Sequence, residues 1–181
     1  MTPTETLKHE HQVILMVLDA AERDAQAAGR GEKISGDRAR EILDFIRTFA
    51  DKCHHAKEEK LLFVRMQERG MSGNSGPIAV MLHEHNLGRN AVRATAEALP
   101  EAEKGDREAL AAFAENLQSY VNLLREHIYK EDNVLYPMAD RLLTPEDQSW
   151  LDAEFERVEV EEIGEGTHEK YHELAHQLAG E

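Results

Sequence analysis

Apolar residues recur at intervals of three and four along most of this chain, which is the spacing that places side chains on one face of an α-helix. The clearest stripe consists of Ile78, Met81, His85, Gly88, Val92 and Leu99. The pattern predicts four long helices and two shorter ones, over about residues 5–28, 35–69, 77–99, 106–142, 145–162 and 167–179.

Residues that start and stop helices lie at the ends of these segments. Thr4 or Thr6 is expected to cap the first helix, and Pro100 is expected to end the third. Pro137 is expected either to kink the fourth helix or to mark its last regular turn. We therefore predict an all-α fold, an up-down-up-down four-helix bundle over residues 1–143, with a C-terminal extension of two additional short helices over residues 144–181 packed on the bundle.

Two stretches of the chain are similar to each other. When residues 53–63 are aligned with residues 126–136, His54 matches His127 and Glu58 matches Glu131. Each histidine lies four residues before its glutamate, so the two side chains share one face of a helix. Phe63 matches Tyr136 in the same alignment. The chain is therefore predicted to contain one histidine-glutamate unit written twice.

A second pair of stretches repeats a histidine in the same way. His-Glu-His occurs at residues 9–11 and again at 83–85, about one helix before each histidine-glutamate unit. On the third helix His85 lies on the apolar stripe and His83 lies off it, whereas on the first helix periodicity does not choose between His9 and His11. His55 lies about 100° around the second helix from His54.

Imidazole and carboxylate side chains together are typical ligands of iron, manganese or zinc, because magnesium and calcium prefer oxygen ligands alone. Two glutamates on facing helices could bridge two metal ions. Two carboxylates and one hydroxide would cancel three of four positive charges, which limits the cost of burial. A metal-free bundle that kept an old duplication is the alternative.

Composition and charge exclude several functions. The chain has 181 residues and a net charge of -15, which repels nucleic acid and anionic membranes. Its single cysteine, Cys53, lies on an apolar stripe and is expected to be a buried, inert thiol. The start of the chain lacks the features of a signal peptide, and no apolar run could cross a membrane. A cytoplasmic location follows by elimination.

Three further features have ordinary interpretations that we prefer. His168, His172 and His176 form a stripe on the last helix that favours a packing or surface face over a second metal site. The acidic run from 154 to 165 is expected to be a solvated surface. Tyr120 is expected to be a core residue, although it shares a stripe with His127 and could donate a hydrogen bond to a site there.

From about residue 7 to residue 138 the sequence resembles the hemerythrin-like (HHE cation-binding) family. The resemblance rests on His-Glu-His near the start, His-His-x-x-Glu-Glu on the second helix, Met-x-x-Glu-His-x-x-Gly-Arg on the third and Glu-His-x-x-x-Glu-x-x-x-Leu-Tyr-Pro on the fourth. It implies a four-helix bundle around two iron ions with an oxo or hydroxo bridge, and zinc or manganese could replace iron in a recombinant sample. The metal ligands that it implies are His11, His54, Glu58, His85, His127 and Glu131, with the two glutamates bridging.

The sequence departs from the oxygen-carrying hemerythrins. Met81 stands where those proteins have a further histidine, and Glu131 follows His127 by four residues where they have an aspartate after five. The four-His, two-Glu pattern is closer to members linked to peroxide, nitric oxide or iron-centre repair, and one fewer histidine leaves coordination positions open. We therefore expect a diiron protein that binds or reduces oxygen, peroxide or nitric oxide, with a protein redox partner. The alternatives are an iron- or oxygen-sensing module, an iron store or a repair protein, so catalysis itself is left undecided.

Overall fold

The computed structural model describes residues 1–180, and all its regular structure in that range is helical, as predicted. Four long helical columns form the bundle. The first is α1 and the third is α4, while the second and fourth are built from consecutive segments separated by π-helical turns. In chain order the elements are α1 (Pro3–Gly29), α2 (Gly36–Phe45), η1 (Ile46–His55), η2 (Glu58–Leu62), α3 (Phe63–Glu68), α4 (Gly76–Ala102), α5 (Arg107–Lys130), η3 (Glu131–Leu135), α6 (Tyr136–Leu142), α7 (Pro145–Arg157), η4 (Val158–Gly164) and α8 (Thr167–Ala179).

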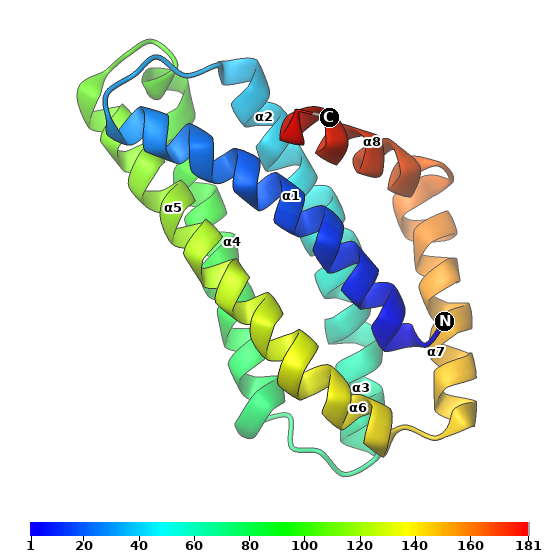
Figure 1. The fold of residues 1–181 in the computed structure, drawn as a ribbon. Coiled ribbons are helices and arrows are strands. Elements are labelled where there is room, and N and C mark those ends of the chain that lie inside the picture. Colours follow the sequence, from blue (N-terminus) through cyan, green and yellow to red (C-terminus); the bar gives the residue numbers. More distant parts are fainter. Residues whose placement is uncertain (181) are drawn as a thin grey trace.

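The four columns alternate in direction, so the predicted up-down-up-down topology is confirmed (Figure 1). The connections at the two ends of the bundle are short, and α5 packs against both α1 and α4. Gly88 of α4 faces α5 closely, since a Cβ at this position would lie 3.4 Å from the Tyr120 ring, about van der Waals contact.

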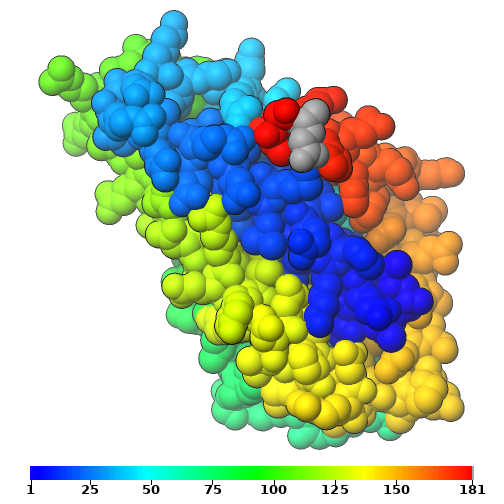
Figure 2. Space-filling view, in the orientation of Figure 1, coloured from blue at the N-terminus to red at the C-terminus, as the bar shows by residue number. Residues whose placement is uncertain are grey.

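The C-terminal segment α7, η4 and α8 turns back along the bundle (Figure 1). Helix α8 packs against α1 and α2, and η4 packs against η1. In the space-filling view these residues lie beside α1 over much of its length (Figure 2). The segment is therefore closely packed on the bundle, whereas the domain division at residue 143 stays a prediction.

Two predicted helix ends were wrong. The first helix is capped by Thr2, whose hydroxyl accepts from the Glu5 backbone N–H while the Glu5 carboxylate accepts from the Thr2 N–H. This capping box is stronger than a cap by Thr4 or Thr6 alone, because it satisfies two backbone donors. Pro100 lies inside α4, which continues to Ala102.

The π-helical turns are the main departure from the predicted regular helices. Segment η1 ends at His55, η2 begins at Glu58 and η3 begins at Glu131. A π-helical turn holds more residues than an α-turn and often occurs at a functional site. Pro137 follows η3 in the first turn of α6, where a missing N–H costs little. It therefore lies at the start of a regular helix, directly after an irregular turn.

The bundle interior contains two apolar clusters with a polar layer between them. The larger cluster includes Phe45, Phe113 and Leu117. The smaller includes Leu62, Met66 and Ile78. The six predicted site residues belong to neither cluster, and all of them are buried. Within residues 1–180, no helix is long and apolar enough to span a bilayer.

Asp147 attaches the C-terminal segment to the bundle. Its carboxylate accepts two hydrogen bonds from the Arg69 guanidinium, at 2.7 and 2.9 Å, and one from the Thr144 N–H at 3.0 Å. These contacts, that from Arg69 above all, hold the pKa of Asp147 below its usual range.

We expect Asp147→Asn to lower the melting temperature at pH 7, because it removes a charge-assisted pair and weakens the cap of α7. A carboxylate whose folded-state pKa is depressed stabilises the fold above its unfolded pKa of about 3.9, and that stability is lost as the pH falls further. The difference in melting temperature from wild type should therefore shrink below about pH 4. A thermal unfolding series followed by circular dichroism checks this, and a pH-independent difference would contradict it.

Candidate metal centre

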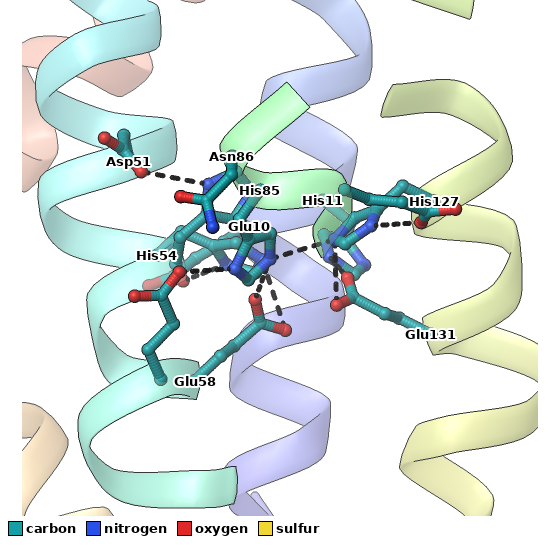
Figure 3. Close-up of polar contacts among 12 residues, drawn as sticks. Glu10, His11, Asp51, His54, Glu58, His85, Asn86, His127 and Glu131 are labelled. Atoms are coloured by element: carbon teal, nitrogen blue, oxygen red, sulfur yellow. Dashed lines mark hydrogen bonds and ion pairs between the residues drawn. The ribbon is translucent and has the colours of Figure 1, made fainter. Parts of the chain in front are cut away.

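Two groups of ligand atoms meet in the polar layer of the bundle (Figure 3). In each group the atoms lie within 4.8 Å of one another, and every residue is buried. We call them site A, which consists of His11, His54, Glu58 and Glu131, and site B, which consists of His55, Glu58, His85 and His127. The structure therefore brings together all six residues that the resemblance implied as ligands, and it adds His55.

The two glutamates lie between the two sites. Glu131 Oε2 is 3.2 Å from His11 Nε2, and Glu131 Oε1 is 3.0 Å from His127 Nε2. Glu58 Oε2 is 3.3 Å from His85 Nε2, and its Oε1 is 3.8 Å from His54 Nε2. Each carboxylate thus directs one oxygen to a histidine of site A and the other to a histidine of site B, which is the placement that a bridging ligand requires.

His55 is not among the ligands that the resemblance implied, yet it lies in the site. Its ring is buried and stacks on His85, with 4.0 Å between the ring centroids. The 100° rotation per residue used for the prediction applies to a regular α-helix, whereas His54 and His55 lie at the end of the π-helical segment η1. The wider turns change the rotation per residue, so both rings point inward.

Every histidine of the two sites has a carboxylate at its Nδ1 atom. An ionised carboxylate can only accept, so each Nδ1 donates its proton, and in the neutral form of the ring the Nε2 atom carries the lone pair. The partners are Asp132 for His11 at 2.7 Å, Glu10 for His54 at 2.7 Å, Asp51 for His55 at 3.3 Å, Glu59 for His85 at 2.7 Å and Glu84 for His127 at 2.8 Å.

Carboxylates hold protons on two of these rings when no other cation is present. Burial alone would lower the pKa of His11, but Asp132 and Glu131 outweigh it and raise the pKa to about 9. Burial is likewise outweighed at His127, where Glu131 and Glu84 raise the pKa to about 10. The layer therefore attracts positive charge strongly.

Against the effect of burial, Glu58 and Glu59 likewise raise the pKa of His85, whereas the remaining site groups respond differently. Burial lowers the pKa of His55, and the nearby His85 charge lowers it further. Burial would raise the pKa of Glu58, but the charges of His54 and His85 lower it below its usual range. Burial and the Glu58 charge also oppose ionisation of Glu131, yet His127 and His11 lower its pKa. Both glutamates are therefore ionised at neutral pH.

Several enclosed atoms in the layer lack a hydrogen-bond partner within residues 1–180. They include His54 Nε2, Glu58 Oε2 and both carboxylate oxygens of Glu131, although histidine nitrogens lie close to three of them. His85 Nε2 and His127 Nε2 face each other at 3.1 Å. Because both are lone-pair atoms in the neutral rings, a proton or a metal cation has to lie between them. The donor set fits a metal.

Tyr136 is a site residue that the sequence analysis did not identify. Its hydroxyl donates to Glu58 Oε1 at 2.6 Å and lies 3.3 Å from His11 Nε2. Burial first, and then the charges of Glu131 and Glu58, raise the pKa of Tyr136 well above its usual value, so it stays a donor. Two features of the sequence could have indicated its inward position, namely the Leu-Tyr-Pro motif and the alignment of Tyr136 with Phe63, which is buried.

A buried ion-pair chain connects site A to the C-terminal segment. Lys57 has no exposed surface, and its Nζ donates to Glu10 Oε1 at 2.5 Å and to Glu159 of η4. Glu10 in turn holds His54. His168 Nε2 of α8 lies 3.6 Å from Glu10 Oε1. Glu159, which belongs to the acidic run that we expected to be solvated, therefore makes a specific contact.

His9 and His83 are exposed and take no part in either site. Cys53 is buried, and burial raises the pKa of its thiol to about 12, as expected for an inert cysteine. His168 and His172 pack against Phe49, which agrees with the packing role preferred for them. Glu10, Glu159 and His168 also form a cluster that could hold a cation, and Lys57 Nζ already contacts both of its carboxylates.

We expect Lys57→Met to lower the free energy of unfolding by about 3–5 kcal/mol, because it leaves the Glu10 carboxylate buried without its cation. The double variant Lys57→Met with Glu10→Gln should recover part of that loss. Urea titration measures both. Lys60→Met is the matched control, since Lys60 is largely exposed and its removal should cost less than about 0.5 kcal/mol. Equal losses at Lys57 and Lys60 would refute the buried pair.

Comparison with known proteins agrees with this geometry. The sequence is 22% identical over 165 residues to uncharacterized proteins of Mycobacterium bovis and of two Mycobacterium tuberculosis strains, CDC 1551 and H37Rv. The similarity covers 91% of this chain, and the chain spans 64% of the length of these relatives. Residues 2–139 match the hemerythrin HHE cation-binding domain. This match covers most of the chain and includes all residues of sites A and B, so the protein belongs to the hemerythrin HHE cation-binding family.

Proposed function

We propose that sites A and B hold two iron ions and that the protein binds or reduces a small oxidant there, namely oxygen, peroxide or nitric oxide. His11 and His54 would bind the first ion, and His55, His85 and His127 the second. Glu58 and Glu131 would bridge the two ions. A pair of irons, when bound, can supply electrons to such an oxidant.

The observation that carries this proposal is the ring of carboxylates at the Nδ1 atoms. A carboxylate at Nδ1 fixes the tautomer of a histidine, orients the ring and makes Nε2 a better ligand. All five histidines share this arrangement. A bundle held together only by hydrocarbon would gain nothing from aiming five lone pairs into its interior, where unpaired polar atoms are costly.

The protein's own residues define what would surround a bound ligand. The Tyr136 hydroxyl lies beside Glu58 and His11 and can hold a proton close to site A. His55 gives site B a third imidazole, although Met81 replaces the histidine of the oxygen carriers. Site A has two imidazoles, and we infer that an exogenous ligand binds more readily on that side, next to the tyrosine.

A non-catalytic role is the second candidate. The ion pairs from Glu159 through Lys57 and Glu10 to His54 give the C-terminal segment a physical connection to the centre, which suits a sensing module. Iron storage and iron-centre repair have no comparable observation in their favour. The redox partner and the cytoplasmic location stay predictions.

We expect His54→Ala and Glu58→Ala to lose most of the bound iron, because each removes a group that faces the interior of the layer. His9→Ala and His83→Ala are matched controls, since both side chains are exposed and each lies two residues before a site histidine, His11 or His85. Elemental analysis of each protein after expression with iron checks this. Equal loss in all four variants, or no iron in the wild type, would refute the assignment.

We expect Tyr136→Phe to retain iron but to change the near-ultraviolet absorption and to slow peroxide turnover by about tenfold or more, because it removes a charge-assisted hydrogen bond to Glu58 worth about 1.5–3 kcal/mol. Absorption spectra and single-turnover kinetics with peroxide check this. Phe63→Tyr, at the corresponding position of the other half, tests whether the effect depends on the location of the hydroxyl. Unchanged spectra and rates in Tyr136→Phe would exclude this role.

A further inference from the structure

A pocket of about 250 Å³ lies beside site B, between η1, α4 and α5. His55 and His85 form part of its wall, so it reaches the metal centre. The rest of its lining comes from Ile46, Arg47, Asp51, Glu84, Gly88, Arg89, Val92, Arg93, Tyr120 and Leu124.

The pocket is much larger than a diatomic ligand requires. One water molecule occupies about 30 Å³ in the liquid, so the volume corresponds to several waters. Ile46, Val92 and Leu124 supply apolar wall, as in pockets that take small organic molecules. The volume and the lining therefore favour a ligand with an apolar body.

Tyr120 provides an unused donor in this pocket. The side chain is only 3% exposed and lines the pocket. Within residues 1–180 its hydroxyl pairs with no other residue, and it is not among the enclosed atoms that lack a partner, so it reaches the open space of the pocket. Burial and the neighbouring Asp51 charge raise the pKa of this phenol, so it remains protonated. A hydroxyl that faces a pocket can donate its hydrogen bond to a ligand or to water there.

Arginines give the pocket a positive side. Arg89 is neutralised by Asp51 and Glu59. Glu84 is neutralised by Lys130 and faces His127, and Asp51 also pairs with His55. Arg47 and Arg93 have no ion pair with a carboxylate of the described chain and are exposed. In a protein with a net charge of -15, two uncompensated arginines beside one pocket are a specific attraction for an anion.

We propose that this pocket binds a small organic monoanion of the carboxylate class. Its apolar body contacts Ile46, Val92 and Leu124, its carboxylate pairs with Arg47 and Arg93, and Tyr120 donates a hydrogen bond to a polar group of the ligand. Binding in the pocket does not require metal, whereas any effect of the ligand on oxidant chemistry rests on the function proposed above. The ligand would lie against His55 and His85 and could act as a co-substrate or control access to site B.

Benzoate is a suitable probe, and benzamide is its uncharged counterpart. We expect calorimetry with the protein as purified to show that benzoate binds and that benzamide binds at least about tenfold more weakly. The double variant Arg47→Gln with Arg93→Gln should bind benzoate about tenfold more weakly than wild type, because it removes a charge-assisted contact. Arg157→Gln is the matched control, because Arg157 lies on α7 and outside the pocket. Tyr120→Phe should weaken binding without lowering the melting temperature.

The iron content of each sample separates the two proposals. Absence of iron together with arginine-dependent benzoate binding would refute the diiron function and support the pocket. Equal affinity for benzoate and benzamide, or an unchanged affinity in the double arginine variant, would overturn the pocket proposal whatever the iron content. Acetate, which lacks the apolar body, should bind at least about tenfold more weakly than benzoate, because the buried apolar area is lost. Equal binding of acetate would overturn the assigned ligand class.

Discussion

The constraint on which the rest of this structure depends is the burial of two carboxylates at the centre of a helical bundle. Glu58 and Glu131 have no exposed surface, and their oxygens face imidazole nitrogens from all four columns of the bundle. Such charges destabilise a fold unless positive charge lies close to them. Five histidines, each held by its own outer carboxylate, surround them. The two apolar clusters on either side exclude water and keep the layer at one level of the bundle.

Ion pairs that extend outward from this layer attach the C-terminal segment to the bundle. Residues 144–180 lie beyond the region that matches the family, yet Glu159 reaches the fully buried Lys57, and Lys57 reaches Glu10 behind His54. Asp147 makes a second attachment through Arg69. The segment therefore packs on the same side as site A and covers charges that the four columns alone would leave facing solvent.

Most of the fold could be predicted from the sequence because helix periodicity, proline and glycine are local signals. The pairing of His54 with Glu58 and of His127 with Glu131 could also be predicted, since it depends on spacing within one helix. The inward position of His55 could not be predicted, because a helical wheel assumes the same rotation for every residue and π-helical turns depart from it. Glu10 and Lys57 were missed for a different reason. Their partners are remote in sequence, and a charged residue on a helix is ordinarily expected to face solvent.

The internal repeat has a consequence for the equivalence of its two halves. Phe63 lies parallel to His85, with 6.2 Å between ring centroids, and Tyr136 lies parallel to His11 at 5.5 Å. The two rings occupy corresponding places, and they differ by a single oxygen atom. That oxygen contacts only the side of the layer where His11 lies. The repeat therefore makes the two halves alike in backbone but unequal in chemistry, since one side of the layer has a hydroxyl donor where the other has only hydrocarbon.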